Sequence, residues 1–257
     1  MESKKEKNIL TYNNWTVMIE ASKPIMPLAE VFAKEKEIKM KFPEMVFDQN
    51  TVDIKNDIYN FRLSFNALDY MKNRCKEGEI PQVTINTNKK WNLKLTVDSK
   101  DQEITTFSDG YDWTFLSLYG GKTECSKEYQ PTEEKIDMNR LMRHEDILQY
   151  GSVILLEDDY HDNGIGQLVI KTRVMPSYIF VLSQYYCRID EVIVRVVEHR
   201  YFIDTRDNYI KHEYKYMSAP WSAFPDSECY TEYFRNNLNK YSGSFKVEDY
   251  KLEEIRF

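Results

Sequence analysis

The sequence predicts an α+β protein in which antiparallel β-sheets pack together and several α-helices flank them. Consecutive short β-patterned segments joined by close turns favour antiparallel pairing, and separate stretches show helical spacing with capping residues. The 257-residue chain has no linker rich in Gly, Ser or Pro that would divide it. We therefore expect one domain over residues 15–241, between a flexible lead-in at 1–14 and a C-terminal tail at 242–257.

Strand and helix patterns alternate in the first half of the chain. Trp15, Val17 and Ile19 alternate with polar residues, as in a half-buried strand. Asn66 can cap a helix in which Asp69 takes the third position, where a carboxylate is favourable. Residues 28–35 and 67–75 are predicted as helices, residues 61–65 and 111–114 as strands, residues 80–97 as a hairpin or meander and residues 98–109 as a polar loop.

The second half is predicted to consist mainly of strands. Asp137 can cap a helix over residues 138–148, and Asp226 or Ser227 can cap another that extends to residue 238. Strands are predicted over residues 153–156, 168–175, 178–188, 192–203 and 209–216.

Composition and charge narrow the function classes. A formal net charge of −7 argues against nonspecific attraction to nucleic acid. The longest strongly apolar run, residues 178–187, is too short to span a bilayer, and residues 1–8 are charged rather than signal-like. We expect a soluble protein of the cytoplasm, with the nucleus as a second location, that binds neither nucleic acid nor membrane.

The four Cys and four His residues are far apart and show no ligand spacing. Nucleotide-binding, serine-hydrolase and zinc-protease motifs are also absent from the sequence. We therefore expect no cofactor, no metal and no disulfide.

The acidic turn at residues 157–162 is the candidate catalytic site. Its Glu157, Asp158, Asp159, His161 and Asp162 could bind a hard cation or activate water, as in a metal-dependent hydrolase. The spacing matches no defined metal loop. A turn whose Asp and Asn side chains bond to their own backbone explains the same residues.

A second candidate is the basic stretch around Lys171 and Arg173. On a strand these two residues and Met175 share one face, so two cations line up on one side of a sheet. Such a row can bind a partner's carboxylates. A polar face in solvent, or ion pairs with the acidic turn, explains it equally well.

Several uncommon strings occur in a fixed order: ASK at residues 21–23, PEM at 43–45, FNA at 65–67, YDWT at 111–114, then EDDYHDNG, KTRVMPS, RID and VIVR. This order closely resembles the TIPRL family, the TOR signalling pathway regulator-like proteins. The resemblance spans residues 15–216 and is weak over residues 77–109 and past residue 217.

The resemblance implies a non-enzymatic, monomeric α+β protein with a cleft that takes the catalytic subunit of a type 2A-like protein phosphatase, including its C-terminal tail. Members of the family associate with type 2A, type 4 and type 6 catalytic subunits, restrain their activity or govern their assembly, and are tied to TOR signalling. An adaptor protein is a further partner that this resemblance leaves open.

The resemblance also implies four partner-binding positions: Asp69, Ile136, Val196 and Glu198. Val196 and Glu198 stand where the family commonly has Met and Asp. Glu191 replaces the Gly usual after RID, so we expect strain or a different turn there. Our own hypothesis adds Lys171 and Arg173 as residues that hold the acidic phosphatase tail or its carboxylate.

Overall fold

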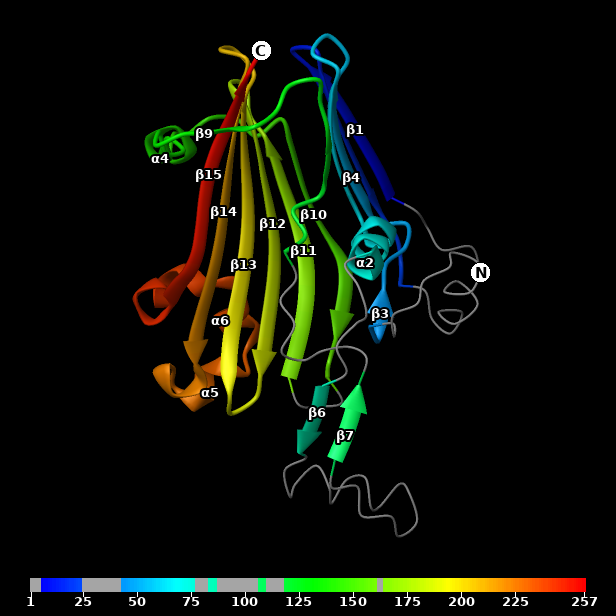
Figure 1. Cartoon of the computed structure of the whole chain (residues 1–257). Helices are drawn as coiled ribbons and strands as arrows, with labels where there is room; N and C mark the ends of the chain where they lie inside the picture. Colours follow the sequence, from blue (N-terminus) through cyan, green and yellow to red (C-terminus); the bar gives the residue numbers. More distant parts are fainter. Residues whose placement is uncertain (1–5, 25–42, 77–82, 87–105, 110–117, 161–163) are drawn as a thin grey trace.

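The computed structural model describes residues 6–24, 43–76, 83–86, 106–109, 118–160 and 164–257. Two antiparallel sheets pack face to face, and the helices lie at the margins of the larger sheet and beside the smaller one (Figure 1). The predicted helix at residues 28–35 and the predicted strand at residues 111–114 lie outside the described residues.

The larger sheet has eight strands in the order β3-β10-β11-β12-β13-β14-β15-β9, and every neighbouring pair is antiparallel. Its two outermost strands have only two residues each. The strands are β3 (Met45–Val46), β9 (Gln130–Pro131), β10 (Gln149–Asp158), β11 (Gly164–Val174), β12 (Tyr178–Ile189), β13 (Ile193–Asp204), β14 (Tyr209–Pro220) and β15 (Lys246–Arg256).

The smaller sheet has five strands in the order β1-β2-β4-β5-β8. A separate two-stranded ladder pairs β6 with β7, which lies in the segment predicted as a polar loop. The strands are β1 (Glu6–Tyr12), β2 (Trp15–Ala21), β4 (Thr51–Asn56), β5 (Phe61–Asn66), β8 (Lys122–Glu124), β6 (Val83–Asn86) and β7 (Thr106–Asp109).

The main core lies between the two sheets. Strand residues alternate between the two faces of a sheet, and one face of β11–β14 contributes buried side chains to the same cluster as β2, β4 and β5. Ile170, Val181 and Tyr201 come from the larger sheet, and Leu63 and Phe65 from the smaller. We call this face of the larger sheet its inner face and the opposite one its outer face.

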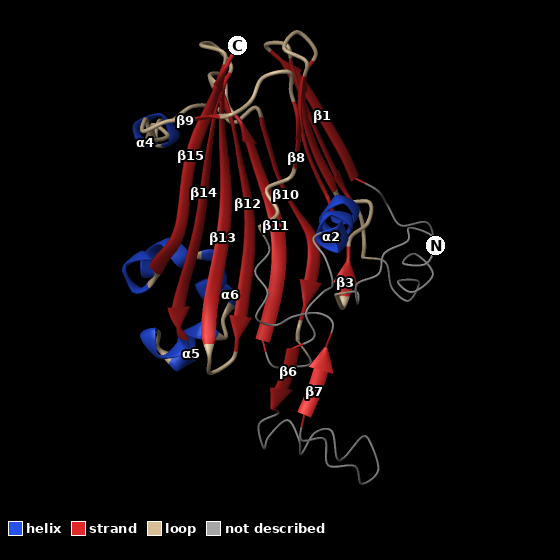
Figure 2. Ribbon diagram, viewed as in Figure 1, coloured by secondary structure: helices blue, strands red, loops and turns tan. Residues whose placement is uncertain are grey.

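Two smaller clusters cover the ends of the outer face. The first contains Tyr186 and Val196 and lies beneath the C-terminal helices. The second contains Ile136, Met175 and Phe202 and lies beside α4 (Met138–Leu141). Figure 2 shows the C-terminal helices and α4 near opposite ends of the long strands.

Among the described residues, the helices other than α2 (Ala67–Lys76) are shorter than the sequence predicted. Asn66 caps α2: its Oδ1 accepts from the Asp69 N–H at 2.8 Å, and its Nδ2 donates to Asp69 Oδ2 at 2.7 Å. Asp137 caps α4, as predicted, but this helix ends at Leu141. Met142 is 71% exposed, so continued helical spacing would bury no apolar face there.

The predicted C-terminal helix is divided. Short helices α5 (Asp226–Cys229) and α6 (Glu232–Asn236) are followed by a 3₁₀ segment, η2 (Leu238–Ser244). Thr231 Oγ1 accepts from the Phe234 N–H at 3.1 Å, so a new helix starts where the sequence predicted continuation. Another 3₁₀ turn, η1 (Trp221–Ala223), precedes them.

The expected lead-in and tail both contain strands. β1 pairs with β2 along its whole length, from Glu6 to Tyr12, and β15 pairs with β14. β1 exposes most of its side chains, and β15 exposes those of its first half, residues 246–251. They therefore lack the alternating apolar pattern that identifies a half-buried strand.

The turn between β12 and β13 contains a left-handed residue that is not glycine. The Val192 N–H donates to the Ile189 carbonyl at 3.1 Å, and Glu191 has φ = 62°. Glu191 therefore adopts a left-handed conformation that is strained for a residue with a β-carbon, as expected for this position.

A membrane-spanning helix is not found among the described residues, because their helices lack the necessary length and apolar character.

Candidate functional site

The uncovered middle of the outer face is the first candidate site. Residues directly opposite each other on paired strands share a face, so Lys171 lies in a row with Leu182, Arg200 and Glu213. A parallel row runs through Gln184, Glu198 and Lys215. We call these residues, with Arg173, the outer strip: Lys171, Arg173, Leu182, Gln184, Glu198, Arg200, Glu213 and Lys215.

An ion-pair network occupies the centre of the outer strip. Arg200 Nη2 lies 2.5 Å from Glu198 Oε2, and Arg200 Nη1 lies 3.2 Å from Glu213 Oε2. Gln184 Nε2 donates to the other oxygen of Glu198 at 2.8 Å. Burial alone lowers the pKa of Arg200, but its attraction to the two carboxylates outweighs this and raises the pKa. Glu198 is therefore a buried, fully paired carboxylate.

Lys171 and Arg173 share the outer face, as the sequence predicted, but differ in their contacts. Arg173 Nη2 donates to Tyr178 Oη at 3.1 Å and approaches the Leu141 carbonyl at 3.4 Å. Lys171 is half-buried, and its ammonium makes no hydrogen bond or ion pair with the described residues. The same holds for Lys215. Among the described residues, neither Lys171 nor Arg173 pairs with the acidic turn.

The other predicted partner-binding residues are spread over the fold. Ile136 and Val196 lie at the two covered ends of the outer face and are 6% and 0% exposed. Asp69 lies on α2, which packs against β5 of the smaller sheet. The structure thus brings Lys171, Arg173 and Glu198 together on the outer strip and leaves Asp69 elsewhere.

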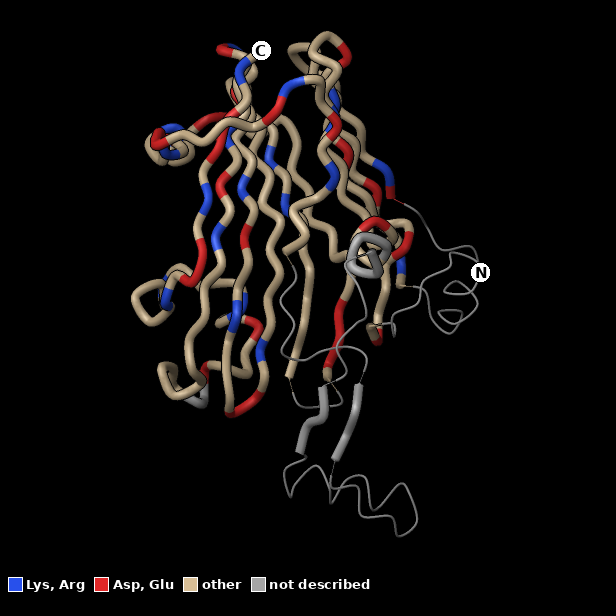
Figure 3. Tube along the Cα trace, in the orientation of Figure 1, with Lys and Arg blue, Asp and Glu red and all other residues tan. Residues whose placement is uncertain are grey.

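Sequence reasoning missed several residues around the outer strip. Arg200, Glu213 and Lys215 form its charged centre, and alternation along β14 could have indicated the last two. Figure 3 shows both signs of charge interspersed along these strands. An apolar rim also borders the strip near Arg173: the exposed Tyr150 lies opposite Arg173 on β10, and the exposed Met142 follows Leu141, whose carbonyl Arg173 approaches.

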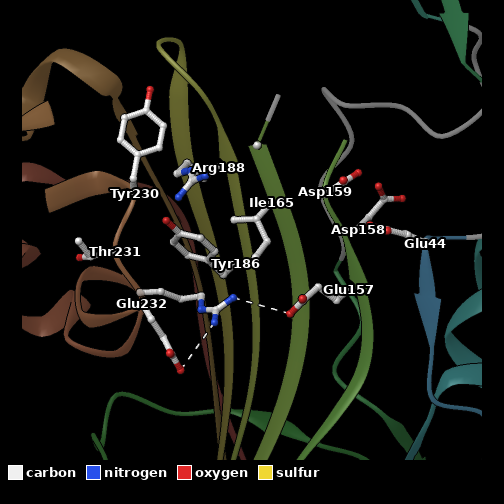
Figure 4. Close-up of a pocket in the computed structure, with 12 residues that line it drawn as sticks. Glu44, Glu157, Asp158, Asp159, Ile165, Tyr186, Arg188, Tyr230, Thr231 and Glu232 are labelled. Atoms are coloured by element: carbon white, nitrogen blue, oxygen red, sulfur yellow. Dashed lines mark ion pairs between the residues drawn. The ribbon is translucent and has the colours of Figure 1, made fainter. Parts of the chain in front are cut away.

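The acidic turn forms one wall of a pocket at the other end of the sheet (Figure 4). Asp158 Oδ1 accepts from the Tyr160 N–H at 2.9 Å, as expected of a structural turn. His161 and Asp162 lie outside the described residues. Within the described part of the chain, no three His, Cys, Asp or Glu side chains are placed to share a metal ion. The hydrolase alternative thus gains no support.

Residues 45–224 match the model of the TIP41-like family. A TIP41-like protein of Caenorhabditis elegans is 34% identical over 188 residues, which cover 73% of this chain and 65% of that protein. The type 2A phosphatase activator TIP41 of Saccharomyces cerevisiae is 32% identical, over 80% of this chain and 61% of that protein. A TIP41-like protein of Homo sapiens is 30% identical, over 81% and 79%.

The aligned part of the chain spans less than two thirds of the length of the nematode and budding-yeast relatives. The family match nevertheless covers most of this chain, including all of β10 to β14. It confirms the resemblance that the ordered strings indicated. The chain belongs to the TIP41-like family.

Proposed function

We propose that this protein binds the catalytic subunits of the type 2A-like serine/threonine phosphatases, namely the type 2A, type 4 and type 6 enzymes. By occupying a surface of the enzyme it restrains activity or controls holoenzyme assembly, in connection with TOR signalling. The support is family membership, since relatives in Saccharomyces cerevisiae and Schizosaccharomyces pombe are named type 2A phosphatase activators. The protein acts as a monomer in the cytoplasm and also the nucleus, with or without an adaptor, and performs no chemistry.

The observation that carries this proposal is the outer strip, which has the chemistry of a protein-binding surface. It combines two half-buried lysines that form no ion pair with the described residues, a paired central network and an apolar rim. Apolar contacts beside complementary charges are typical of protein interfaces. We place the expected peptide-binding cleft on this strip, between the two covered ends of the outer face.

Within this surface, Lys171 and Arg173 hold the C-terminal tail of the catalytic subunit or its carboxylate. Arg173 already contacts Tyr178, which fixes its guanidinium on the strip. Lys171 has no ion pair with a carboxylate of the described residues, so a partner's carboxylate would not have to displace one. Such a contact gains Coulomb energy that salt screens.

The test is direct binding of each purified catalytic subunit to the immobilised protein, at low and high salt. Lys171→Ala should weaken binding by about threefold to fivefold at low salt, with a smaller difference at high salt. Lys55→Ala is the matched control, because Lys55 is an exposed lysine on β4 of the smaller sheet. Failure of the wild-type protein to bind any of the three subunits would refute the function. Unchanged affinity of Lys171→Ala would refute only the assignment of the tail.

A further inference from the structure

The smaller sheet ends at β1, an edge strand without the features that usually prevent a further strand from pairing. Its seven residues, Glu6 to Tyr12, pair with β2 in an unbroken register, and none is a proline. The ladders next to the edges of the larger sheet, β10–β11 and β14–β15, both contain a register shift. Prolines and bulges hinder the addition of a strand. Figure 1 shows β1 at the outer margin of the smaller sheet.

The turn between β1 and β2 determines which backbone groups of β1 face outward. Asn13 and Asn14 both have positive φ, 49° and 65°, as a two-residue type I′ turn requires. Tyr12 and Trp15 flank this turn, so they exchange both of their backbone hydrogen bonds. From this pair onward, bonded pairs alternate along the ladder with pairs whose backbone groups point away from each other.

Three residues of β1 therefore direct their backbone groups away from β2. Lys7, Ile9 and Thr11 belong to the alternate pairs, so their three N–H and three C=O groups face the open edge. All three residues are exposed, and none of these groups bonds to the described residues. A row of unpaired N–H and C=O groups is a template on which the strand of another molecule can pair.

The side chains of β1 leave apolar surface beside this edge on both faces of the sheet. Leu10 and Tyr12 lie on the face that packs against the larger sheet, opposite Val17 and Trp15, but both are only half-buried. Ile9 lies on the other face and is 53% exposed. A further strand would cover the free flank of these side chains, as β2 covers their other flank. Apolar residues on that strand would thus gain contacts on both faces.

The charges of the edge favour a partner with a basic residue. Lys7 is the only cation of β1, and its ammonium is held by Glu20 on β2 at 2.7 Å. Glu6 is exposed and forms no ion pair with the described residues. The edge therefore offers one unpaired carboxylate in a chain whose net charge is −7. A basic segment would be attracted both by this carboxylate and by the charge of the whole molecule.

A second copy of the chain fits this edge less well than a partner of other sequence. A register in which the outward groups of both copies all pair is centred on Ile9, and it places Asn8 opposite Leu10 and Glu6 opposite Tyr12. Each half-buried apolar side chain would then face a polar one. Two copies, each with a net charge of −7, would also repel each other.

We propose that β1 takes an extended segment of a partner protein as a further antiparallel strand of the smaller sheet. The segment has apolar or β-branched side chains opposite Ile9, Leu10 and Tyr12, and a basic side chain opposite Glu6. Its backbone bonds to the outward N–H and C=O groups of β1. This edge belongs to the smaller sheet, whereas the outer strip belongs to the larger one, so the two bindings are independent.

The first test is amide hydrogen exchange, measured by NMR with the peptide acetyl-Lys-Val-Thr-Val-Ile-Thr-Thr-Lys-amide. Its last seven residues are designed to lie opposite Tyr12 to Glu6 in antiparallel order. At saturating peptide, exchange at the amides of Lys7, Ile9 and Thr11 should slow by at least about tenfold, because each gains a hydrogen bond. Exchange rates of these three amides that the peptide leaves unchanged would overturn the proposal.

Two N-methylated forms of the peptide test backbone pairing with side chains and charge held constant. The first carries N-methyl groups on the residues opposite Ile9 and Thr11, whose N–H groups would bond to β1. The second carries them on the residues opposite Asn8 and Leu10, whose N–H groups point away. The first should bind at least about tenfold more weakly than the parent peptide, and the second within about threefold of it. Equal affinity of the two forms overturns the proposal.

Ile9→Pro tests the edge from the side of the protein. It removes an outward N–H group and no hydrogen bond to β2, so the urea unfolding midpoint should stay close to that of the wild-type protein. Binding of the peptide should fall by at least about fivefold. Ile9→Thr is the matched control, because it keeps the N–H group and a β-branched side chain. A proline variant that folds and binds as the threonine variant does contradicts the proposal, and the N-methylated peptides decide the matter without any substitution.

Sedimentation without peptide tests the alternative occupant. The sedimentation coefficient of the protein should not depend on its concentration. Dimerisation that Ile9→Pro abolishes would assign the edge to a second copy of the chain and overturn the assignment to a partner segment. No phosphatase is present in any of these measurements, so their failure would leave the proposed function untouched.

Discussion

Single side chains decide how much charge on the outer strip is available to a partner. Arg200 is held between Glu198 and Glu213, and Arg173 is held against Tyr178. Removing Arg200 would leave the buried Glu198 carboxylate without its cation, which is costly to the fold. Lys171 has no such partner among the described residues. Its replacement therefore tests recognition with little effect on stability.

Glu191 is the clearest local conflict between residue and backbone. Glu191 has φ = 62°, a conformation that is strained for a residue with a β-carbon, whereas glycine adopts it at no steric cost. Glu191→Gly should therefore stabilise the protein by about 1 kcal/mol. Urea unfolding would measure this. Glu191→Ala is the control, because it removes the carboxylate and keeps the β-carbon. Equal stability of the two variants would show that backbone strain is not the cause.

At the scale of elements, a buried chain of polar side chains links β13, β14 and β15 on the inner face. His199 Nδ1 lies 3.0 Å from His212 Nε2, and His212 Nδ1 lies 2.9 Å from Glu253 Oε1. If the proton on His212 Nδ1 is donated to Glu253, His212 Nε2 accepts from His199 Nδ1.

This row of buried polar side chains makes the free energy of unfolding depend on pH. Burial, and secondarily the nearby His212, lowers the pKa of His199 from 6.5 to about 3. Below pH 6.5 the unfolded state therefore binds a proton that the folded state does not, and stability falls as the pH falls. The loss should reach about 2 kcal/mol between pH 6.5 and about pH 5.

His199→Gln should make this pH dependence shallower, because glutamine keeps a hydrogen-bonding group and does not titrate. Urea unfolding of the wild-type protein and the variant at the two pH values would measure the difference. The exposed His144→Gln is the matched control. An unchanged slope in His199→Gln would mean that another group is responsible.

The same scale shows which elements a sequence reveals. β11 to β14 bury one face or both, so their apolar residues recur with the period of a strand, and all four were predicted with antiparallel pairing. β1 and the first half of β15 expose most of their side chains. Their charged sequences therefore predicted a lead-in and a tail instead of strands. Capping residues located the starts of α2 and α4, but packing determined where α4 ended.

At the scale of the whole molecule, Phe65 joins the two sheets. Its ring is fully buried and lies 6.1 Å from that of Tyr201 on β13, in an edge-to-face arrangement. Phe65→Ala should destabilise the protein by about 3–5 kcal/mol. Hydrogen exchange should report lost protection in β12 and β13 as well as in β4 and β5. Protection lost in the smaller sheet alone would show that the two sheets unfold separately.

The candidate site could be predicted only in part, because it depends on this pairing of sheets. Alternation placed Lys171 and Arg173 on one face, which the structure confirms. The sequence could not show that the opposite face of β11 would be covered by the smaller sheet, or that Arg200 would pair with Glu198. The pocket depends on Tyr186 and Arg235, from β12 and α6, whose meeting no local pattern encodes.

The two-residue strand β9 has a consequence for the mode of recognition. It pairs with β15 only at Glu253 and Glu254, and the rest of that edge carries charged residues and an irregular register near Met217. Charges and bulges hinder the addition of a further strand. At this edge, a partner would therefore bind through side chains instead of extending the backbone ladder of the sheet, so its selectivity would be sensitive to single substitutions.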